Sequence, residues 1–321
     1  MNELAYDLWL SRVPGIGPRK TEKILAACGS ARECFEMKEK ELRRIYGLSE
    51  EDVQSILLSR REDPEKLQKE LEEKEVHAVR RGEKGYPESL AEIPDSPWVL
   101  YYKGRLPEEK KPTVAIVGAR QCSEYGRAMA RTIARSLSEA GVTIVSGMAA
   151  GIDAAGHWGA LDASGETYGV LGNGVDICYP RSSGPLYEKL LKQGGVLSEY
   201  FPGTKPCPRF FPLRNRIISA LSDAVIVIEA RIRSGSLITA DYALEQGKEI
   251  YALPGRITDP LSGGTNRLIR QGAFAIVSVE ELLRDLPVGS GKIAEKTEAQ
   301  KNMLAKEEMV VYSCLDFVPK C

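Results

Sequence analysis

Five short segments of this chain contain glycine, most of them together with serine or arginine, and each segment follows a run of apolar residues. The segments are Gly118-Ala119-Arg120-Gln121-Cys122-Ser123, Ser146-Gly147-Met148-Ala149-Ala150-Gly151, Gly172-Asn173-Gly174, Arg231-Ile232-Arg233-Ser234-Gly235-Ser236 and Pro254-Gly255-Arg256. A glycine lets the backbone approach a phosphate at the start of a helix, and an arginine offers a planar fork to its oxygens. One such segment alone is most simply a tight turn where only glycine fits. Five of them along one edge predict an anion-binding surface.

The first segment differs from a dinucleotide-binding loop. The G-x-G-x-x-G pattern places a glycine where this chain has Arg120, whose side chain hinders the close approach of a pyrophosphate. An acidic residue is also expected about 20 residues later, at the end of the next strand, and Ser146 stands there instead. We therefore expect no NAD and no other cofactor at this loop.

The most basic stretch of the chain, residues 204–216, contains four bases and no acid. Its bases are Lys205, Arg209, Arg214 and Arg216, and Phe210 and Phe211 lie between them. Bases interleaved with aromatic rings suit single-stranded nucleic acid, because the cations follow the phosphates and the rings stack on bases. The alternative is that the rings fill the core while the arginines are solvated. We expect one phenylalanine to be buried and the other exposed.

Candidate catalytic groups are few. His157 follows Asp153 on a predicted helix, but no nucleophile motif such as G-x-S-x-G accompanies this pair. Cys122 precedes a predicted helix close to Arg120, a setting that lowers the pKa of a reactive thiol, yet we interpret it as an incidental small residue. Glu229 is either a general base or a partner for an arginine at the sheet edge. No Walker A, HExxH or EF-hand pattern is present, so we expect no catalytic residue and no metal site.

The apolar runs before the five segments predict the scaffold that positions them. Runs such as Thr113–Val117, Val142–Val145 and Ala224–Ile228 are continuously apolar, which is typical of parallel strands covered on both faces. Helical patterns separate most of the runs. Residues 76–287 therefore predict an extended Rossmann-like, doubly wound α/β domain with a mainly parallel sheet. Ligands bind such sheets at the carboxyl ends of the strands, so the five segments belong to one binding edge.

Three further regions flank this domain. Residues 1–60 predict a small all-helical domain, and its turn Val13-Pro14-Gly15-Ile16-Gly17-Pro18 matches a helix–hairpin–helix. Gly15, Gly17 and Lys20 form a possible second contact with DNA phosphates. Residues 61–75 hold seven acids and four bases and predict a solvated linker helix. Residues 288–321 have the pattern of a linker and of the truncated start of a further domain.

Composition narrows the functional classes further. A length of 321 residues suggests about two domains. A net charge of −1 and a pI of about 6.3 argue against a globally basic mode of nucleic-acid binding but allow a local basic patch. The chain has no run of about 18 apolar residues and no basic leader, so we expect no membrane partner. Its seven scattered cysteines favour free thiols in a reducing cytoplasm.

The order of the motifs resembles the DNA-processing protein A family (DprA, also called Smf). The resemblance rests on Gly118-Ala119-Arg120, Ser146-Gly147-Met148-Ala149, Leu171-Gly172-Asn173-Gly174, Phe211-Pro212-Leu213-Arg214-Asn215-Arg216 and Ser234-Gly235-Ser236-Leu237, and it spans roughly residues 83–287. It implies a cytoplasmic homodimer of natural transformation, without enzymatic turnover, that protects incoming single-stranded DNA and loads the RecA recombinase onto it. It also implies that the C-terminal segment begins a winged-helix-like domain.

The resemblance places DNA contacts at Arg120, at Arg181 and along residues 205–216. Combined with the glycine-rich turns, this defines a candidate DNA-binding set. Its members are Gly118, Arg120, Ser123, Gly126, Ser146, Gly147, Gly151, Gly172, Asn173, Gly174, Arg181, Lys205, Arg209, Phe210, Phe211, Arg214, Asn215, Arg216, Ser234, Gly235 and Ser236.

A second hypothesis, from a different class of protein, stays open. Related Rossmann-like folds hydrolyse the N-glycosidic bond of nucleoside monophosphates. The turn at residues 234–239 and the later Glu245 echo their phosphate-binding and catalytic motif, although the first proline and the second glycine of that motif are missing.

Overall fold

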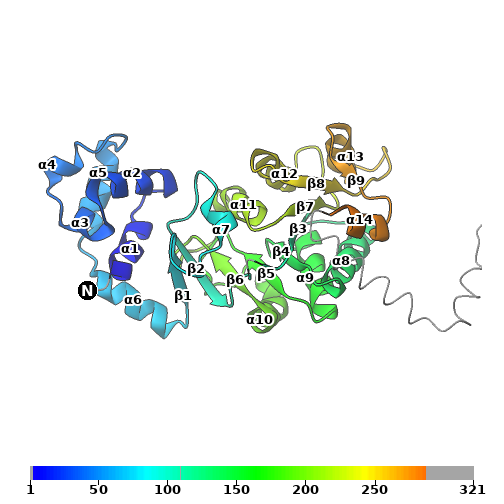
Figure 1. Cartoon of the computed structure of the whole chain (residues 1–321), viewed down its shortest axis with the longest axis horizontal. Helices are drawn as coiled ribbons and strands as arrows, with labels where there is room; N and C mark the ends of the chain where they lie inside the picture. Colours follow the sequence, from blue (N-terminus) through cyan, green and yellow to red (C-terminus); the bar gives the residue numbers. More distant parts are fainter. Residues whose placement is uncertain (1–2, 109, 287–321) are drawn as a thin grey trace, which may run out of the picture.

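The computed structural model describes residues 3–108 and 110–286 of the chain. These residues form a helical region at the N-terminus, followed by an α/β domain (Figure 1). The linker and winged-helix-like start predicted for residues 288–321 lie outside the described residues. Within the described part, no helix is both long and apolar enough to cross a bilayer.

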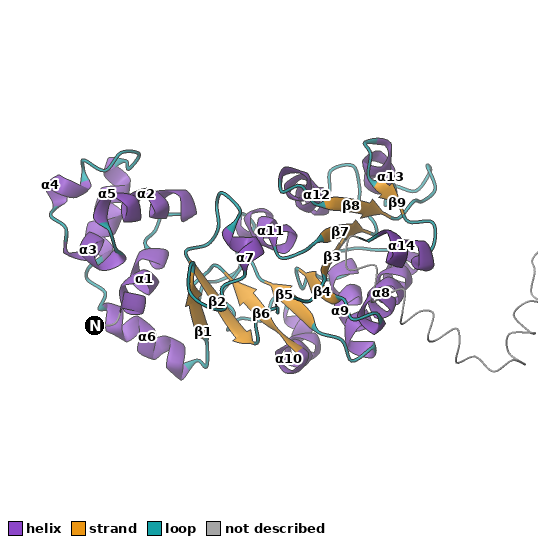
Figure 2. Cartoon of the chain, in the orientation of Figure 1, coloured by secondary structure: helices purple, strands orange, loops and turns teal. Residues whose placement is uncertain are grey.

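A nine-stranded sheet forms the centre of the α/β domain (Figure 2). Its strands are β1 (His77–Arg80), β2 (Val99–Gly104), β3 (Thr113–Val117), β4 (Thr143–Ser146), β5 (Thr167–Val170), β6 (Gly194–Ser198), β7 (Ala224–Val227), β8 (Glu249–Ala252) and β9 (Phe274–Ala275). Their spatial order is β1-β2-β6-β5-β4-β3-β7-β8-β9. The seven strands from β6 to β9 in this order pair in parallel, whereas β2 is antiparallel to both β1 and β6. The prediction of a Rossmann-like, mainly parallel sheet is confirmed.

Helices cover both faces of this sheet. They are α7 (Glu88–Ala91), α8 (Glu124–Glu139), α9 (Ile152–Asp162), α10 (Gly184–Gln193), α11 (Phe210–Ala220), α12 (Gly235–Glu245), α13 (Gly263–Arg270) and α14 (Val279–Asp285). In β3, Val114 and Ile116 pack with α8 and α9, while Ala115 and Val117 pack with α11 and α12 on the other face. Every residue of β3 is buried, which explains its continuously apolar sequence.

The chain changes direction across the sheet next to β3. It proceeds from β3 through β4 and β5 to β6, then returns to place β7 on the other side of β3. The segments that follow β3, β4 and β7 therefore meet at one edge. In open α/β sheets this switch point is where ligands bind, because the neighbouring loops diverge there.

One helix at this edge of the sheet was not predicted from the sequence. Residues 210–216 belong to the helix α11, although the proline-rich basic segment gave no helical expectation. Pro212 lies in the first turn of α11, where a missing backbone N–H costs no intrahelical hydrogen bond. The helix positions the second half of the basic segment against the sheet.

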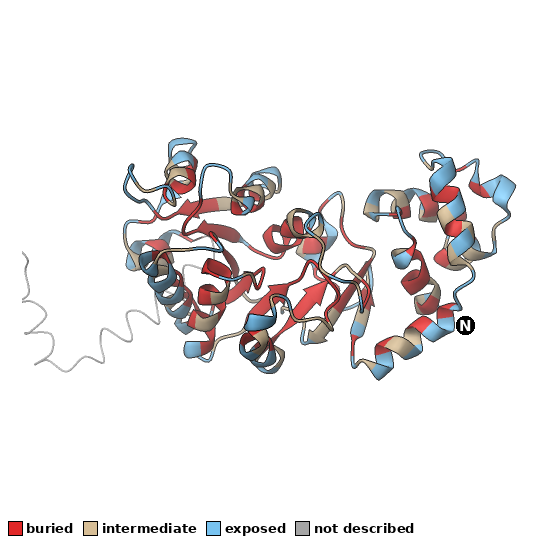
Figure 3. Ribbon diagram, turned by 180° about the vertical axis from the view of Figure 1, so that it is seen from behind, coloured by how far each residue is buried: buried red, intermediate tan, exposed pale blue. Residues whose placement is uncertain are grey.

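The N-terminal region consists of six helices. They are α1 (Glu3–Arg12), α2 (Pro18–Cys28), α3 (Ala31–Glu36), α4 (Glu39–Leu42), α5 (Glu50–Ser59) and α6 (Pro64–Glu73). Their outer surfaces are exposed and their inner faces are buried (Figure 3). The all-helical architecture predicted for this part of the chain is confirmed.

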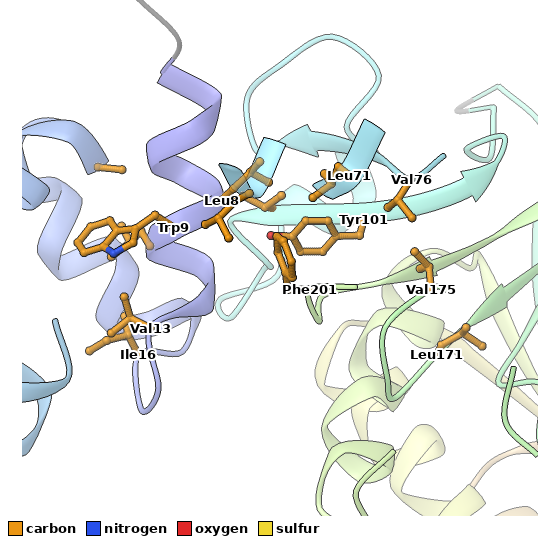
Figure 4. Packing of buried hydrophobic residues seen from close by; sticks show 14 of the residues in the cluster. Leu8, Trp9, Val13, Ile16, Leu71, Val76, Tyr101, Leu171, Val175 and Phe201 are labelled. Atoms are coloured by element: carbon orange, nitrogen blue, oxygen red, sulfur yellow. The ribbon is translucent and has the colours of Figure 1, made fainter. Parts of the chain in front are cut away.

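The charged segment 61–75 packs more closely than expected. Within it, Pro64–Glu73 form the helix α6, and Leu67 and Leu71 are buried in a core shared with Trp9. The same cluster continues to Tyr101 of β2 and to Phe201, so it joins the helical region to the sheet (Figure 4). An amphipathic helix with a charged outer face and two inward leucines accounts for both observations.

Candidate nucleic-acid interface

A cavity of about 440 Å³ opens at the switch point of the sheet. Its walls come from the end of β3 and the loop after it, the turn after β4, the start of α9, one face of α11, the start of α12 and the loop before Pro180. The lining residues are Val117, Gly118, Arg120, Ala149, Asp153, Tyr179, Pro208, Phe211, Pro212, Arg214, Asn215, Ile218, Ser234, Gly235, Ser236 and Thr239. A smaller cavity of about 120 Å³ shares Arg120, Tyr179, Phe211 and Arg214 with it. Two of the three charged residues in the larger cavity are arginines.

The loop that carries Arg120 is held by a carboxylate at the end of β7. Glu229 is buried and accepts hydrogen bonds from the backbone N–H of Ser123 at 2.9 Å and from its hydroxyl at 2.5 Å. The Ser123 Oγ in turn accepts from the N–H of Gly126 at 3.0 Å and caps α8. A Cβ at Gly126 would collide with the Glu229 carboxylate. Glu229 therefore anchors the loop, a role that neither of its two predicted alternatives described.

Arg214 forms the floor of the cavity. Its side chain is buried and donates from Nη1 to the carbonyl oxygens of Gly147, at 2.9 Å, and Val170. A Cβ at Gly147 would approach Nη2 of Arg214 to 2.5 Å, so glycine is needed there. Burial lowers the pKa of Arg214 to about 10, which leaves the guanidinium charged at neutral pH. Burial also raises the pKa of the nearby Asp153, against the opposing effect of the Arg214 charge.

The two phenylalanines of α11 are equivalent in burial. Both are half-buried, so the expectation of one buried and one exposed ring is wrong. Phe211 stacks on Tyr179 with ring centroids 5.5 Å apart, and the guanidinium of Arg120 lies 5.2 Å from the same ring. Phe210 stacks on Tyr200 at 4.3 Å and carries Arg209 at 5.1 Å. Each phenylalanine thus lies in a stack of arginine, phenylalanine and tyrosine, which limits the freedom of the arginine.

Other predicted residues divide into exposed cations and buried supports. Arg120, Arg181, Lys205 and Arg209 are exposed, and Arg181 follows the cavity residue Tyr179 by two positions. Ser146, Gly147, Gly151, Gly172, Asn173 and Gly174 are buried. The Ser146 hydroxyl donates to the carbonyl of Ile116, and the Asn173 amide donates to the carbonyls of Gly174 and Ile177. These residues shape the backbone of the edge rather than face solvent.

Arg216 is placed differently from the prediction. Its side chain is buried, and its guanidinium pairs with Glu199 at 2.7 Å and with Asp95 at 3.2 Å. It also donates to the backbone carbonyls of Asp95 and Leu213. With its donors used in this way, Arg216 has a structural role, and we leave it out of the proposed DNA contacts.

One of the three residues of the predicted hairpin contact with DNA is already bonded within the helical region. Gly15 and Gly17 are exposed. The ammonium of Lys20, however, bonds to Asp52 at 2.6 Å and to the carbonyl of Gly15 at 3.1 Å. Lys20 therefore closes the hairpin on α5.

The histidine and cysteine considered for catalysis have structural surroundings. His157 is buried, and its Nδ1 shares a 2.6 Å hydrogen bond with the hydroxyl of Thr167. Burial lowers the pKa of His157 to about 3. Burial raises the pKa of Cys122, opposite to the direction that activation requires. Among residues 3–108 and 110–286, no group of three or more His, Cys, Asp or Glu side chains is arranged to hold a metal ion.

Two residues that line the cavity were not among the predicted site residues. Tyr179 was not predicted, and it lines the cavity as the stacking partner of Phe211. Asp153 was considered only with His157, yet it lines the cavity with Arg214. Its position directly after Gly151-Ile152, at the start of a helix beside the predicted edge, was the available signal.

Comparison with known proteins identifies the family. The family model for DNA recombination-mediator protein A matches residues 77–287. This chain belongs to that family. A second model, the SAM-like helix-hairpin-helix tandem, matches residues 8–62. The resemblance inferred from the motifs is confirmed.

Individual relatives agree with this assignment. DNA processing protein DprA of Streptococcus pneumoniae is 45% identical over 200 residues, which cover 62% of this chain and 71% of that protein. Protein Smf of Synechocystis is 36% identical over 305 residues, or 94% of this chain and 76% of that protein. The X-ray structure of the Streptococcus pneumoniae DprA matches with a TM-score of 0.78 over 89% of this chain and 98% of that one, at 36% identity. DNA processing protein A of Helicobacter pylori, described for its unique single-stranded DNA binding mode, matches with a TM-score of 0.59 at 30% identity over 66% of this chain and 97% of that one.

Proposed function

We propose that this DNA-processing protein binds single-stranded DNA at the switch-point cavity and acts as a recombination mediator. The observation that carries the proposal is the pairing of Arg120 and Arg214 across one cavity, with the stacked rings of Phe211 and Tyr179 beside them. Arg120 is exposed and restrained by its ring contact, so it meets a phosphate with little loss of side-chain freedom. The name of the Helicobacter pylori relative supports the choice of a single strand.

We propose that three groups at the cavity contribute to phosphate binding in different ways. The Arg120 guanidinium offers charge-assisted hydrogen bonds to a phosphate, and Arg214 adds a positive charge from below that water cannot screen. At the N-terminus of α12, the Ser234 hydroxyl caps the N–H of Ser236, and the backbone N–H groups of Ser234 and Gly235 complete the proposed anion cradle. Phosphate contacts of this kind carry no base information, so binding is expected to be independent of sequence.

Exposed cations continue the surface outside the cavity. Arg181 lies just after the Tyr179-Pro180 wall, and Lys205 and Arg209 precede α11. We propose that a strand leaving the cavity follows these three side chains. Protection of the bound strand, loading of RecA, homodimerisation and a cytoplasmic location belong to the same proposal and rest on membership of the family.

The hydrolase hypothesis finds less support in the geometry. Glu245, which would have to reach the substrate, is exposed and is not one of the residues that line the cavity. Asp153 and Glu229 are buried, and each is bonded to backbone N–H groups of a neighbouring loop. We therefore propose a protein that binds the strand without hydrolysing it.

Fluorescence anisotropy of labelled oligo-dT tests the proposal across a salt series, with duplex DNA and AMP as competitors. We expect preference for the single strand and a log–log slope of about −0.7 per phosphate contacted. The proposal fails if the strand does not bind while AMP is bound or loses its base.

A further inference from the structure

The segment between β6 and α11, which carries Lys205, meets the loop after β5 at one close contact. The carboxylate of Asp176 in that loop accepts a hydrogen bond from the backbone N–H of Gly203 at 2.7 Å. The carbonyl oxygen of Thr204 accepts a second one from the N–H of Gly174 at 2.9 Å. A Cβ at Gly174 would lie 2.7 Å from Oδ1 of Asp176 and 2.9 Å from the nitrogen of Gly203, so the close approach of the two backbones requires glycine there. These four residues form a joint, and Lys205 directly follows it.

The end of α6 adds a charge from the helical region to this joint. Lys74 follows α6, and its ammonium pairs with Asp176 at 3.1 Å and with Glu70 at 2.9 Å. A Cβ at Gly203 would lie 3.4 Å from Nζ of Lys74, so the ammonium also lies beside the backbone of the joint. The Asp176 side chain is only 16% exposed. Salt screens a partly buried pair less than one at the open surface, so this pair holds the joint at physiological ionic strength.

The apolar start of the same segment also packs on the helical region. The ring of Phe201 meets that of Tyr101 edge-on, with centroids 5.5 Å apart, and the guanidinium of Arg12 lies 4.8 Å from it. The Tyr101 hydroxyl shares a 2.6 Å hydrogen bond with the hydroxyl of Ser11 in α1. Val175, from the loop after β5, belongs to the same core cluster as Phe201 (Figure 4). Both halves of the joint are therefore built on contacts with the helical region.

The position of Lys205 depends on this joint. Its side chain is exposed and, among the described residues, has neither an ion-pair nor a hydrogen-bond partner. A long free side chain samples many rotamers, so the backbone that carries it sets its mean position. The other end of the segment is fixed further on, where the N–H of Phe210 donates to the carbonyl of Cys207. Loosening the joint frees the backbone before Lys205, and a contact with a phosphate then costs more ordering.

We propose that Lys74 and Asp176 are positioning residues for strand binding, which fix the backbone before Lys205 so that its ammonium lies on the path of the phosphates. This inference rests on the proposed binding of single-stranded DNA. It predicts a sign that charge alone does not. Removing a carboxylate near a basic surface should by charge alone strengthen the binding of a polyanion, whereas loss of positioning weakens it.

Anisotropy of labelled oligo-dT with the full chain measures this sign. We expect Asp176→Ala and Lys74→Met each to weaken binding about three- to tenfold and not beyond the loss in Lys205→Ala, because one phosphate contact corresponds to roughly tenfold. Asp176→Asn keeps an acceptor for the N–H of Gly203 and should lose less than Asp176→Ala. Glu73→Ala is the matched control, because it removes an exposed acid next to Lys74, and it should not weaken binding. Unchanged or tighter binding in Asp176→Ala would overturn the proposal.

A double variant shows whether the effect passes through Lys205. When Lys205→Ala is already present, the joint has no ammonium left to position, so adding Lys74→Met should weaken binding by less than about twofold further. If the two losses multiply in full, Lys74 acts elsewhere and the proposal is wrong.

Hydrogen exchange in the absence of DNA gives a readout that does not depend on strand binding. In Asp176→Ala the Gly203 amide loses its acceptor and should exchange faster, while the amides of β3 exchange as in the natural chain. Equal exchange at Gly203, together with unchanged binding, refutes the positioning role alone. If the natural chain does not bind oligo-dT, the proposed DNA-binding function fails, and the positioning role fails with it.

Discussion

Replacement of Arg120 by alanine isolates one phosphate contact of the proposed interface. Its side chain is exposed, its guanidinium lies 5.2 Å from the ring of Phe211, and it has no ion-pair partner among the described residues. Removing it should leave the free energy of unfolding unchanged within about 0.5 kcal/mol, because surface positions without such features rarely contribute more. The whole effect should therefore appear in binding.

The size of that effect follows from the exposure of the contact. A hydrogen bond to a charged group contributes about 1.5–3 kcal/mol, and the exposed position of Arg120 favours the lower end. About 1.5 kcal/mol corresponds to roughly tenfold weaker binding. Loss of one phosphate contact should also reduce the steepness of the salt dependence by about 0.7 log units per decade.

Anisotropy of labelled oligo-dT at several salt concentrations measures both quantities in one series. Arg127→Ala is the matched control, because Arg127 is an exposed arginine of the same loop-and-helix unit that pairs with Glu124 and does not line the cavity. We expect the control to bind as the natural chain does. If Arg120→Ala retains both the affinity and the salt slope, or if Arg127→Ala loses as much, the placement of phosphates beside Arg120 is wrong.

Three further predictions concern the support of this edge. Gly151→Ala should destabilise the protein by about 1–3 kcal/mol in urea unfolding, because Gly151 has φ +84° and a Cβ there meets backbone oxygens; Gly184→Ala, which meets no atom within 4 Å, should not. Arg216→Met should lower the free energy of unfolding by about 3 kcal/mol by leaving the mostly buried carboxylate of Glu199, 12% exposed, without its partner, and a loss below 1 kcal/mol would contradict the structural role assigned to Arg216. Burial lowers the pKa of His157 from 6.5 to about 3, so the unfolded chain takes up this proton first as the pH falls. The contribution of the neutral imidazole to stability is complete above pH 6.5 and is lost at up to about 1.4 kcal/mol per pH unit between pH 6.5 and 3. Urea unfolding at pH 7 and at pH 5 measures this effect, and the free energy of unfolding should decrease less between the two pH values in His157→Gln than in the natural chain.

The strands and most helices of the α/β domain were predictable from local patterns. A run such as Thr113–Val117 is almost entirely apolar because helices cover both of its faces, and this pattern can be recognised in the sequence. The helix α11 was missed because its first turn carries Pro212 and a cluster of bases, which resemble an irregular loop when tertiary contacts are unknown. The burial of two leucines of the helix α6 was not predicted, because most residues of this segment are charged and indicated a solvated helix.

The candidate site was predictable in part. Arg120 and the glycines near it could be selected because a parallel sheet brings the ends of its strands to one edge. The difference between Arg214 and Arg216 could not be predicted, since the two arginines are only two residues apart in one basic segment. Arg214 lines the cavity, whereas Arg216 points to Glu199 and Asp95. A helix turns its side chains by about 100° per residue, so neighbours on α11 face different surroundings.

The sequence by itself determined the classes of structure and chemistry in this protein: a parallel sheet, a helical region before it, and an edge rich in glycine and arginine. These properties depend on the type and spacing of residues that are close together in the sequence, so they follow from local conformational preferences and apolar patterns. The tertiary structure alone decided which charges remain available. Whether an arginine meets solvent, as Arg120 does, or two partly buried carboxylates, as Arg216 does, depends on residues that lie far away in the chain. The same long-range packing brought Arg60 to the backbone carbonyls of Cys34 and Met37 in the helical region.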